Sequence, residues 1–442
     1  MRKMEICLFV LVGIVLLLGS LGMAQEKKTL ILWDQFFPAA QSRFIDAVVA
    51  EFEQQHPEVN VERSVMDTES IRKVLKVALS ADAGPDIFYY DSGPGFLGVL
   101  VRAGLVRDLS EDYEQRGWNQ RFFQWTKERC SYDGRVYGVG NEIEYTCVFY
   151  NKAILRELGL ENLVIPYPGE ERVLTLKKYD DYLLICEKAK QAGYVPIAFA
   201  NRDPGRGGHL QSYFYELVAG KEKVEEVMFG NGRWDSSEFV VAWQKFKELQ
   251  DKGYFPPDVN AIDYDEGNML FYIGKSPTHI TGTWLIADIM EIMEDPSVAD
   301  FFLLPPITEG LPMRAAAGIG SAFAISQGTR YPDIAADFID YLFSPANAER
   351  WITEGYIIPP VEVDLERIIE KIPIMMQRAI VGAALPQGHG YNLDVVMPEN
   401  VNYVTKSGIQ ALLAGEKTPE ELAKEIQAAW EEAKQAGLIF KR

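Results

Sequence analysis

The chain has 442 residues and a formal charge of −20, from 44 basic and 64 acidic residues. This length predicts two or three domains, each with enough chain to bury a core. An acidic surface repels nucleic acid and anionic lipid, so neither is expected as a partner.

The first 24 residues have the pattern of a secretory signal peptide. Arg2 and Lys3 precede a long apolar run, and the small residues Gly22 and Ala24 stand at the spacing of a cleavage site. We expect cleavage after Ala24; the alternative is an uncleaved membrane anchor, because the run approaches the length that spans a bilayer. The mature protein is then soluble and periplasmic or secreted. No cysteine stands directly after the cleavage site, so no lipid anchor is indicated.

Three cysteines remain in the mature chain, Cys130, Cys147 and Cys186. Export permits a disulfide, and Cys130 and Cys147 are the pair that a hairpin would bring together. The other interpretation is three separate buried cysteines that act as small apolar side chains.

Strands and helices alternate from the start of the mature chain. Apolar runs predict strands at 28–33, 60–66 and 85–91, and apolar residues at helical spacing predict helices at 43–57 and 70–84. This order implies right-handed βαβ units and a mainly parallel sheet. Ligands bind at the carboxyl ends of the strands in such sheets. The residues at those ends, and therefore the first candidates for a ligand site, are Trp33, Asp34, Asp91 and Ser92.

A second α/β region follows, with amphipathic helices near 178–192, 238–251 and 417–436. No flexible linker separates it from the first region, so we expect strands that cross between two domains, at 141–150 and 317–326. The predicted architecture is two lobes with helix-flanked, mainly parallel sheets. Their predicted bounds are 25–143 with 322–365 for the N-terminal lobe, and 144–321 with 366–442 for the C-terminal lobe.

Motifs for catalysis are weak. The stretch GPGFLG at 93–98 matches a dinucleotide-binding glycine pattern, but Pro94 and its place after a third strand favour a loop that begins a helix. The four histidines are scattered without metal-ligand spacing, and neither a phosphate-binding loop nor a serine nucleophile elbow occurs. We therefore expect that the protein is not an enzyme and that it needs no cofactor or metal.

Glu142 and Glu144 stand two apart on a predicted strand and hence on one face. A glycosidase needs two carboxyl groups that flank a bond, and neighbours on one strand point the same way, which is poor geometry for it. The alternatives are a binding role, in which a carboxylate accepts hydrogen bonds from ligand hydroxyls, and a solvated strand face.

Five segments in the same order resemble one family. They contain a strand, loop and helix, a crossing that ends in YNK, a G-x-W segment, a glycine-rich return with GIGSAF, and a closing helix; they are 85–111, 133–155, 271–289, 315–360 and 412–433. Together they are similar to the bacterial extracellular solute-binding proteins of the maltose-binding type, the receptors of ATP-binding-cassette importers. Gly140 departs from the family, which usually has proline there. The resemblance implies two α/β lobes, a ligand cleft between them and closure by hinge bending.

Trp284 matches the tryptophan of the family's G-x-W segment. The resemblance implies that its ring stacks on the apolar face of a pyranose while carboxylates and amides bind the hydroxyls. The alternative is a core tryptophan at the end of a strand. Weaker candidates lie on the crossings, in the polar loop after 194–200 and near aromatic positions of the family; they are Tyr145, Gly318, Gly320, Ser321, Asn201, Asp203, Tyr356 and Tyr391.

The predicted function is a monomeric receptor that binds a mono- or oligosaccharide and passes it to membrane permease subunits. A receptor for another solute, such as a polyamine or a peptide, is the first alternative. A secreted glycoside hydrolase that uses Glu142 or Glu144 is the second.

Overall fold

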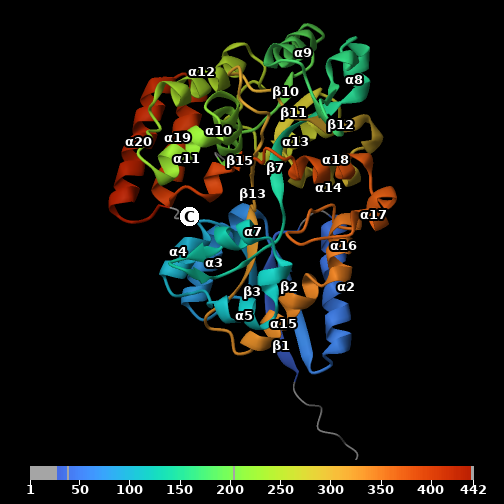
Figure 1. Cartoon of the computed structure of the whole chain (residues 1–442), viewed down its shortest axis with the longest axis vertical. Coiled ribbons are helices and arrows are strands. Elements are labelled where there is room, and N and C mark those ends of the chain that lie inside the picture. Colours follow the sequence, from blue (N-terminus) through green and yellow to red (C-terminus); the bar gives the residue numbers. More distant parts are fainter. Residues whose placement is uncertain (1–26, 37–38, 203–204, 440–442) are drawn as a thin grey trace, which may run out of the picture.

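Two β-sheets organise the molecule, one in each half of the elongated shape in Figure 1. The computed structural model describes residues 27–36, 39–202 and 205–439, so the expected signal peptide lies outside the described residues. Within these ranges no helix combines the length and the apolar character that a membrane span requires. We call the half around the first sheet the first lobe and the other half the second lobe.

The first sheet has four strands that run in one direction and a fifth that runs against them. Its order is β2 (Val59–Val65), β1 (Lys28–Asp34), β3 (Ile87–Asp91), β14 (Ser321–Ile325) and β6 (Val139–Gly140). β1 runs parallel to β2 and β3, whereas β14 runs antiparallel to β3 and β6. The sheet is mixed, because β14 arrives from the second lobe and runs against the local βαβ units.

Both faces of this sheet are buried. Along β3, Ile87 and Tyr89 join one apolar cluster, and Phe88 and Tyr90 join another on the opposite face, as the two-residue period of a strand requires. One face is covered by α2 (Ala39–Gln55), α15 (Pro332–Leu342) and α16 (Pro345–Thr353), the other by α3 (Thr68–Ser80) and α4 (Leu97–Arg102). The helix α4 follows the loop at 93–96, as the sequence predicted for GPGFLG.

The second sheet is also mixed. Its order is β10 (Ile197–Ala198), β11 (Thr278–Gly282), β7 (Glu144–Asn151), β13 (Ala316–Gly318) and β15 (Gly390–Tyr391), and β12 (Ala299–Phe302) also pairs with β7. β7 is antiparallel to β11, β12 and β13, while β13 and β15 are parallel. Two small hairpins complete the strands, β4 (Ser131–Tyr132) with β5 (Arg135–Val136) and β8 (Ile165–Tyr167) with β9 (Glu170–Thr175).

Longer helices surround the second sheet. They are α9 (Tyr179–Gln191), α10 (Gly205–Val218), α11 (Lys221–Phe229), α12 (Ser237–Asp251), α13 (Tyr264–Tyr272), α14 (Ile286–Ile292), α18 (Ile374–Ala383), α19 (Glu399–Ala414) and α20 (Pro419–Gln435). Three of them confirm the helices predicted at 178–192, 238–251 and 417–436. The start of α20 is set by a capping box, in which Thr418 and Glu421 satisfy each other's backbone N–H groups behind Pro419.

The fold also contains short helices and turns. They are α5 (Ser110–Gln115), α6 (Trp118–Arg121), α7 (Gln124–Arg129), α8 (Lys152–Glu157), α17 (Leu365–Ile368), and the 3-10 turns η2 (Thr283–Leu285) and η5 (Leu393–Val395). The turn η2 carries Trp284 directly after β11.

Three connections join the lobes. The chain passes from β6 to β7 through 141–143 and returns from β13 to β14 through 319–320, within the two crossings that the sequence predicted. A third connection, 354–364, runs between α16 and α17 and accepts a hydrogen bond from Ile143 N at Ile358 O, 2.8 Å. Short connections of this kind permit lobes to rotate as bodies.

The three cysteines of the described chain are buried and free. Cys130 follows α7 in the first lobe, whereas Cys147 lies on β7 in the second, so no hairpin pairs them. The second interpretation, of separate apolar side chains, is therefore the correct one.

Candidate functional site

Arginines already hold the two aspartates at the strand ends of the first lobe. Asp34 is fully buried, and its carboxylate accepts hydrogen bonds from Arg63 Nε at 2.6 Å and Nη2 at 2.9 Å. Asp91 accepts from Arg72 Nε at 2.8 Å and Nη2 at 2.7 Å. Burial raises the pKa of Asp34 in spite of the guanidinium. These bidentate pairs hold the aspartates at the strand ends in one orientation. The pair with Asp91 also brings Arg72, which sequence reasoning missed, to the carboxyl end of β3.

Trp33 and Ser92 lie beside these aspartates. Trp33 is partly buried and packs against the apolar cluster that includes α3. Ser92 is buried, its Oγ donates to Ile319 O at 2.8 Å, and its N–H donates to Gly320 O at 2.9 Å. The end of β3 is thus bonded to the connection between β13 and β14.

The glycine-rich return meets the two glutamates of the other crossing. In β7, Glu144 pairs in register with Gly318 of β13, and a Cβ added at Gly320 would lie 2.3 Å from Glu144 Oε1. Glycine at 320 therefore leaves the space that the buried Glu144 carboxyl occupies. Ser321 begins β14 and is buried.

Glu142 faces the same region as Glu144. Tyr89 Oη donates to Glu142 Oε1 at 3.1 Å. Burial raises the pKa of Glu142, and it raises the pKa of Tyr89, where Glu142 and Glu144 both add an unfavourable charge. Ile143 between them points to the other side of the connections, where it lines a cavity described below. The two carboxyl groups are thus neighbours on one face, as predicted.

Trp284 is partly buried and held in one orientation. Its indole N–H donates to Tyr264 Oη at 3.0 Å, and its ring centroid lies 4.8 Å from that of His209. A Cβ at Gly282 would lie 1.8 Å from the indole, so the ring covers the backbone of that glycine. This close approach explains why glycine stands two residues before the tryptophan. The inner part of Trp284 packs against the core of the second lobe.

A polar cluster next to Trp284 was missed by the sequence analysis. His209 Nδ1 lies 3.3 Å from Asn392 Oδ1, and His209 Nε2 lies 4.0 Å from Asp394 Oδ2. Asn402 Nδ2 donates to the Asp394 carbonyl at 2.7 Å. Asn392 and Asp394 follow β15 and therefore lie at the carboxyl end of a strand, where ligands bind. The sequence did not reveal this strand, because two residues are too few to show an alternation of apolar and polar side chains.

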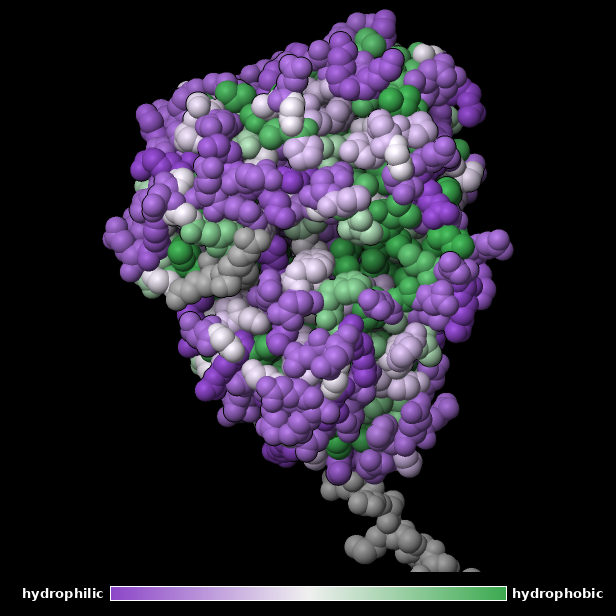
Figure 2. All heavy atoms as spheres, viewed as in Figure 1, coloured by the Kyte–Doolittle hydropathy of each residue, from purple (hydrophilic) through white to green (hydrophobic). Residues whose placement is uncertain are grey.

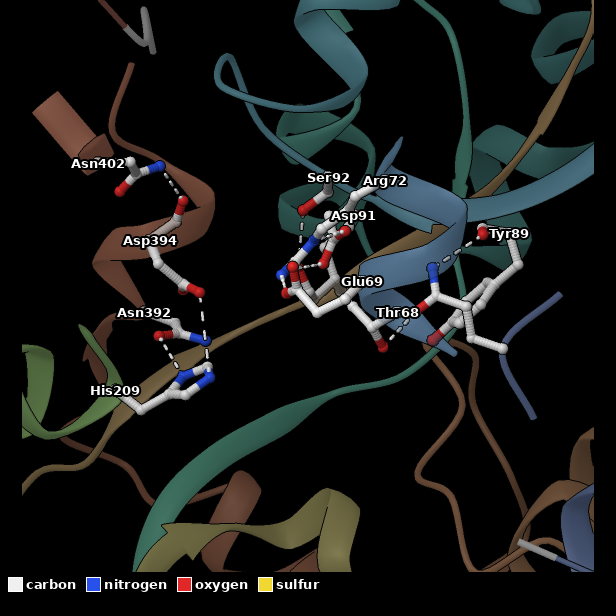
Figure 3. A network of polar contacts seen from close by, with 12 residues as sticks. Thr68, Glu69, Arg72, Tyr89, Asp91, Ser92, His209, Asn392, Asp394 and Asn402 are labelled. Atoms are coloured by element: carbon white, nitrogen blue, oxygen red, sulfur yellow. Dashed lines mark hydrogen bonds and ion pairs between the residues drawn. The ribbon is translucent and has the colours of Figure 1, made fainter. Parts of the chain in front are cut away.

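Figure 3 shows how the polar groups of the two lobes face one another. The side chains of the first lobe come from α3 and β3, and those of the second lobe from α10, η5, α19 and the residues around them. The labelled residues are Thr68, Glu69, Arg72, Tyr89, Asp91 and Ser92 in the first lobe, and His209, Asn392, Asp394 and Asn402 in the second.

The lobes are in contact around this cluster. Arg43 on α2 pairs with Glu291 on α14, with Nη2 and Oε1 3.1 Å apart. Gly93 lies so close to the second lobe that a Cβ there would be 1.4 Å from Val395 O. The cluster is therefore enclosed between the lobes.

The other candidates lie away from the strand ends or in packed positions. Tyr145 is buried in the second lobe, donates to Ala379 O at 3.1 Å and stacks on His389. Asn201 is fully buried, with its Nδ2 donating to Asn260 Oδ1 at 2.9 Å. Tyr356 has a left-handed backbone, with φ of 55°, and packs against the second-lobe core. Asp203 lies outside the described residues.

Tyr391 belongs to a large cavity on the opposite side of the connections. This cavity has a volume of about 960 Å³ and is lined by residues of α7, the 354–364 connection and α18, together with Ile143 and Ala317. Figure 2 shows the hollow with apolar surface around it, in the region where Figure 1 shows α7, α16, α17 and α18. Arg129 of the first lobe stacks on the Tyr391 ring at 4.6 Å. Polar side chains also line this cavity; they are Gln124, Glu128, Arg129, Lys221, Glu362 and His389.

Within the described residues, no group of three or more His, Cys, Asp or Glu side chains is arranged to hold a metal ion. The arrangement at the strand ends instead combines an oriented aromatic ring with carboxylates, amides and an arginine. Such a set binds a polar ligand by stacking and hydrogen bonding.

Comparisons with known proteins agree on one family and one fold. The sequence profile described as bacterial extracellular solute-binding protein matches residues 47–377. The maltotriose-binding protein of Pyrococcus abyssi (strain GE5 / Orsay) is 24% identical over 242 residues, which are 54% of this chain and 45% of that protein. The maltodextrin-binding protein MdxE of Bacillus subtilis (strain 168) is 22% identical over 333 residues, 72% of this chain and 70% of that protein.

The alignment thus spans less than half of the first of these relatives. The solved structure of a chitin oligosaccharide binding protein superposes with a TM-score of 0.78 at 20% identity and covers 92% of this chain and 100% of that one. At this identity the likeness concerns the fold.

Proposed function

The chain belongs to the bacterial extracellular solute-binding protein family, and from that premise we propose that it binds a carbohydrate between its two lobes and delivers it to an ATP-binding-cassette importer. The relatives named above as binding maltotriose, maltodextrin and chitin oligosaccharides support this class of ligand. In this proposal residues 25–143 with 322–365 and 144–321 with 366–442 form the lobes, and the exported chain begins at Gln25.

The position of Trp284 carries the proposal. A pyranose has two apolar C–H faces and an edge of hydroxyl groups, so its receptor needs an aromatic plane with polar groups around it. Trp284 is such a plane, fixed by its hydrogen bond to Tyr264 and flanked by His209. Glu142, Glu144 and Arg72 supply charged partners from the other elements of the enclosed region.

The test is a thermal-shift screen of the purified mature protein. Mono- and oligosaccharides of glucose, galactose, xylose and N-acetylglucosamine are added one by one, with spermidine and a tripeptide as members of other solute classes. A ligand that binds only the folded form raises the melting temperature by mass action. We expect a sugar to raise it and the other solutes to leave it unchanged.

Two outcomes would contradict this proposal. A shift with spermidine or the peptide and with no sugar would assign the site to another solute. Release of reducing ends from an oligosaccharide that binds would indicate a hydrolase. A receptor leaves the bound glycan intact, and chromatography of the incubated sugar distinguishes the two.

A further inference from the structure

Asp394 is a buried carboxylate with one oxygen, Oδ1, that lacks a hydrogen-bond donor among the described residues. The residue is 6% exposed. Its Oδ2 lies 4.0 Å from His209 Nε2, which is beyond hydrogen-bond distance. A buried carboxylate without donors is costly, because the lost hydration is not replaced. Such a group is retained where something outside the free protein supplies the donors.

The surroundings point the carboxylate toward the region between the lobes. Asp394 lies on η5, and Asn402 holds its backbone by donating to the Asp394 carbonyl. In Figure 3 the carboxylate extends from this turn toward His209 and toward the side where Arg72 and Asp91 lie. His209 in turn contacts the Trp284 ring. Only the His209 side chain therefore separates the Asp394 carboxylate from the Trp284 ring.

The first lobe reaches the same turn. Gly93 approaches Val395, the neighbour of Asp394, so closely that no Cβ fits between them. Burial lowers the pKa of Arg72 in the first lobe, but the charges of Asp91, Glu69 and, more weakly, Asp394 outweigh it and raise this pKa. The charge of Asp394 also acts on Lys406, whose pKa burial lowers. The carboxylate is consequently enclosed by both lobes, and a ligand held there is shielded from water.

We propose that Asp394 is a ligand-binding residue of the Trp284 subsite, where its carboxylate accepts hydrogen bonds from hydroxyl groups of a neutral sugar. This inference rests on the proposed function and adds a residue that neither the sequence nor the family resemblance singled out. Since Asp394 Oδ1 is an acceptor without a donor among the described residues, the subsite selects ligand groups that donate a hydrogen bond.

The test uses the mature protein and the substitution Asp394→Asn, which keeps the shape and removes the charge. The probe is an equimolar mixture of maltotriose, galactose, xylotriose and N,N′-diacetylchitobiose, followed by calorimetry with each member that binds. Loss of hydrogen bonds to a charged acceptor weakens binding by about 10- to 100-fold. The melting temperature of the sugar-free variant should change little, because the substitution keeps the shape of the side chain and Oδ1 has no hydrogen bond to lose.

Asp300→Asn is the matched control. Asp300 is equally buried in the second lobe, but its carboxylate is already paired with Arg378 and bonded to Phe301 N. That variant is expected to lose stability and to keep its affinity. The opposite responses of the two variants separate a binding role from a structural one.

The possible results test the role of Asp394 separately from the proposed function. Unchanged affinity in Asp394→Asn, with sugar binding in the wild type, would overturn the inference and leave the proposed function standing. Weaker binding together with a lower melting temperature would assign Asp394 a structural role and also overturn it. No binding of any member by the wild type would remove the proposed function and the inference with it.

Discussion

Trp284 is held by contacts that orient its ring without burying it completely. The indole N–H bonds to Tyr264, and the ring lies over Gly282 and beside His209. A core tryptophan would be fully enclosed, as Trp234 and Trp243 of the same lobe are. This difference in enclosure supports the proposal that Trp284 contacts the ligand, whereas Trp234 and Trp243 serve packing.

Replacement of Trp284 is therefore expected to affect binding more than folding. Trp284→Ala should lose roughly 1–3 kcal/mol of affinity, about 10- to 150-fold, because a rigid aromatic anchor dominates binding in an enclosed site. Its free energy of unfolding should fall by less than the roughly 3–5 kcal/mol expected for emptying a core tryptophan site. Calorimetry with the sugar found in the screen and denaturant unfolding measure the two quantities.

Trp284→Phe is the control, and it should recover part of the affinity through its smaller aromatic face. Unchanged affinity with a large loss of stability would instead place Trp284 in the core and move the stacking role to Trp33.

Glu216 is a second residue whose environment predicts a measurable response. It is 3% exposed on α10, both of its carboxyl oxygens lack partners among the described residues, and burial raises its pKa to about 8. A folded-state pKa above the unfolded value means that the native protein holds the proton longer. Its contribution to stability is therefore complete at acidic pH and is lost as the pH rises toward and through about 8.

Glu216→Gln should remove this pH dependence, because glutamine has no proton to lose. We expect the variant to exceed the wild type in unfolding free energy at pH 9 by roughly 1–3 kcal/mol, the cost of an unsatisfied buried polar group. Urea unfolding at pH 5, 7 and 9 measures the difference. The exposed Glu62→Gln should follow the wild type at all three values, and an identical curve for Glu216→Gln would disprove the assignment.

At the scale of elements, the connection between β13 and β14 positions a carboxylate of the neighbouring strand. Gly318 and Gly320 stand in the same short stretch but meet different neighbours. A Cβ at Gly320 would lie 2.3 Å from Glu144 Oε1, whereas the nearest atom to a Cβ at Gly318 is Asn392 Cβ at 3.6 Å. Only the first of these substitutions must displace the Glu144 carboxyl.

Gly320→Ala should consequently weaken sugar binding by about tenfold, the effect of losing one hydrogen bond to a charged group. Its stability should change little, because the displaced atoms are the end of a flexible side chain. Gly318→Ala should retain both affinity and stability, since 3.6 Å is ordinary van der Waals contact. Equal affinities in the two variants, measured by calorimetry, would show that Glu144 does not contact the ligand.

At the scale of the whole molecule, contacts on one side of the connections hold the lobes together. Arg43 and Glu291 form an ion pair between α2 and α14, while a cavity of about 960 Å³ remains on the opposite side. Rotation about the connections would separate the first set of contacts and compress the cavity. The ion pair between Arg43 and Glu291 would break if the lobes separated, so it stabilises their closed arrangement.

Arg43→Glu is expected to favour the open form, because it replaces an attraction by a repulsion. An exposed ion pair contributes about 0.2–1 kcal/mol, so the affinity for sugar should fall by about two- to fivefold. Small-angle scattering should show a larger particle without sugar and a return to the compact size at saturation. The exchanged pair Arg43→Glu with Glu291→Arg should restore the wild-type values; failure of the exchange would show that the contact does not control closure.

The sequence by itself determined the elements, the two crossings and the family. Local periodicity reports which side chains are buried, and this is enough to locate strands such as 28–33 and helices such as 417–436. The ordered motifs identified the solute-binding family, which the match over residues 47–377 confirms. The same rules placed Asp34 and Asp91 at strand ends and Glu142 with Glu144 on one face.

Only the tertiary structure decided which of these groups already have partners. Asp34 is paired with Arg63 and Asp91 with Arg72 across gaps of 29 and 19 residues, and His209 meets Asn392 from 183 residues away. The entry of β14 from the second lobe likewise makes the first sheet mixed. Pairings of this kind depend on how separate segments pack, and no local pattern of apolar and polar residues encodes them.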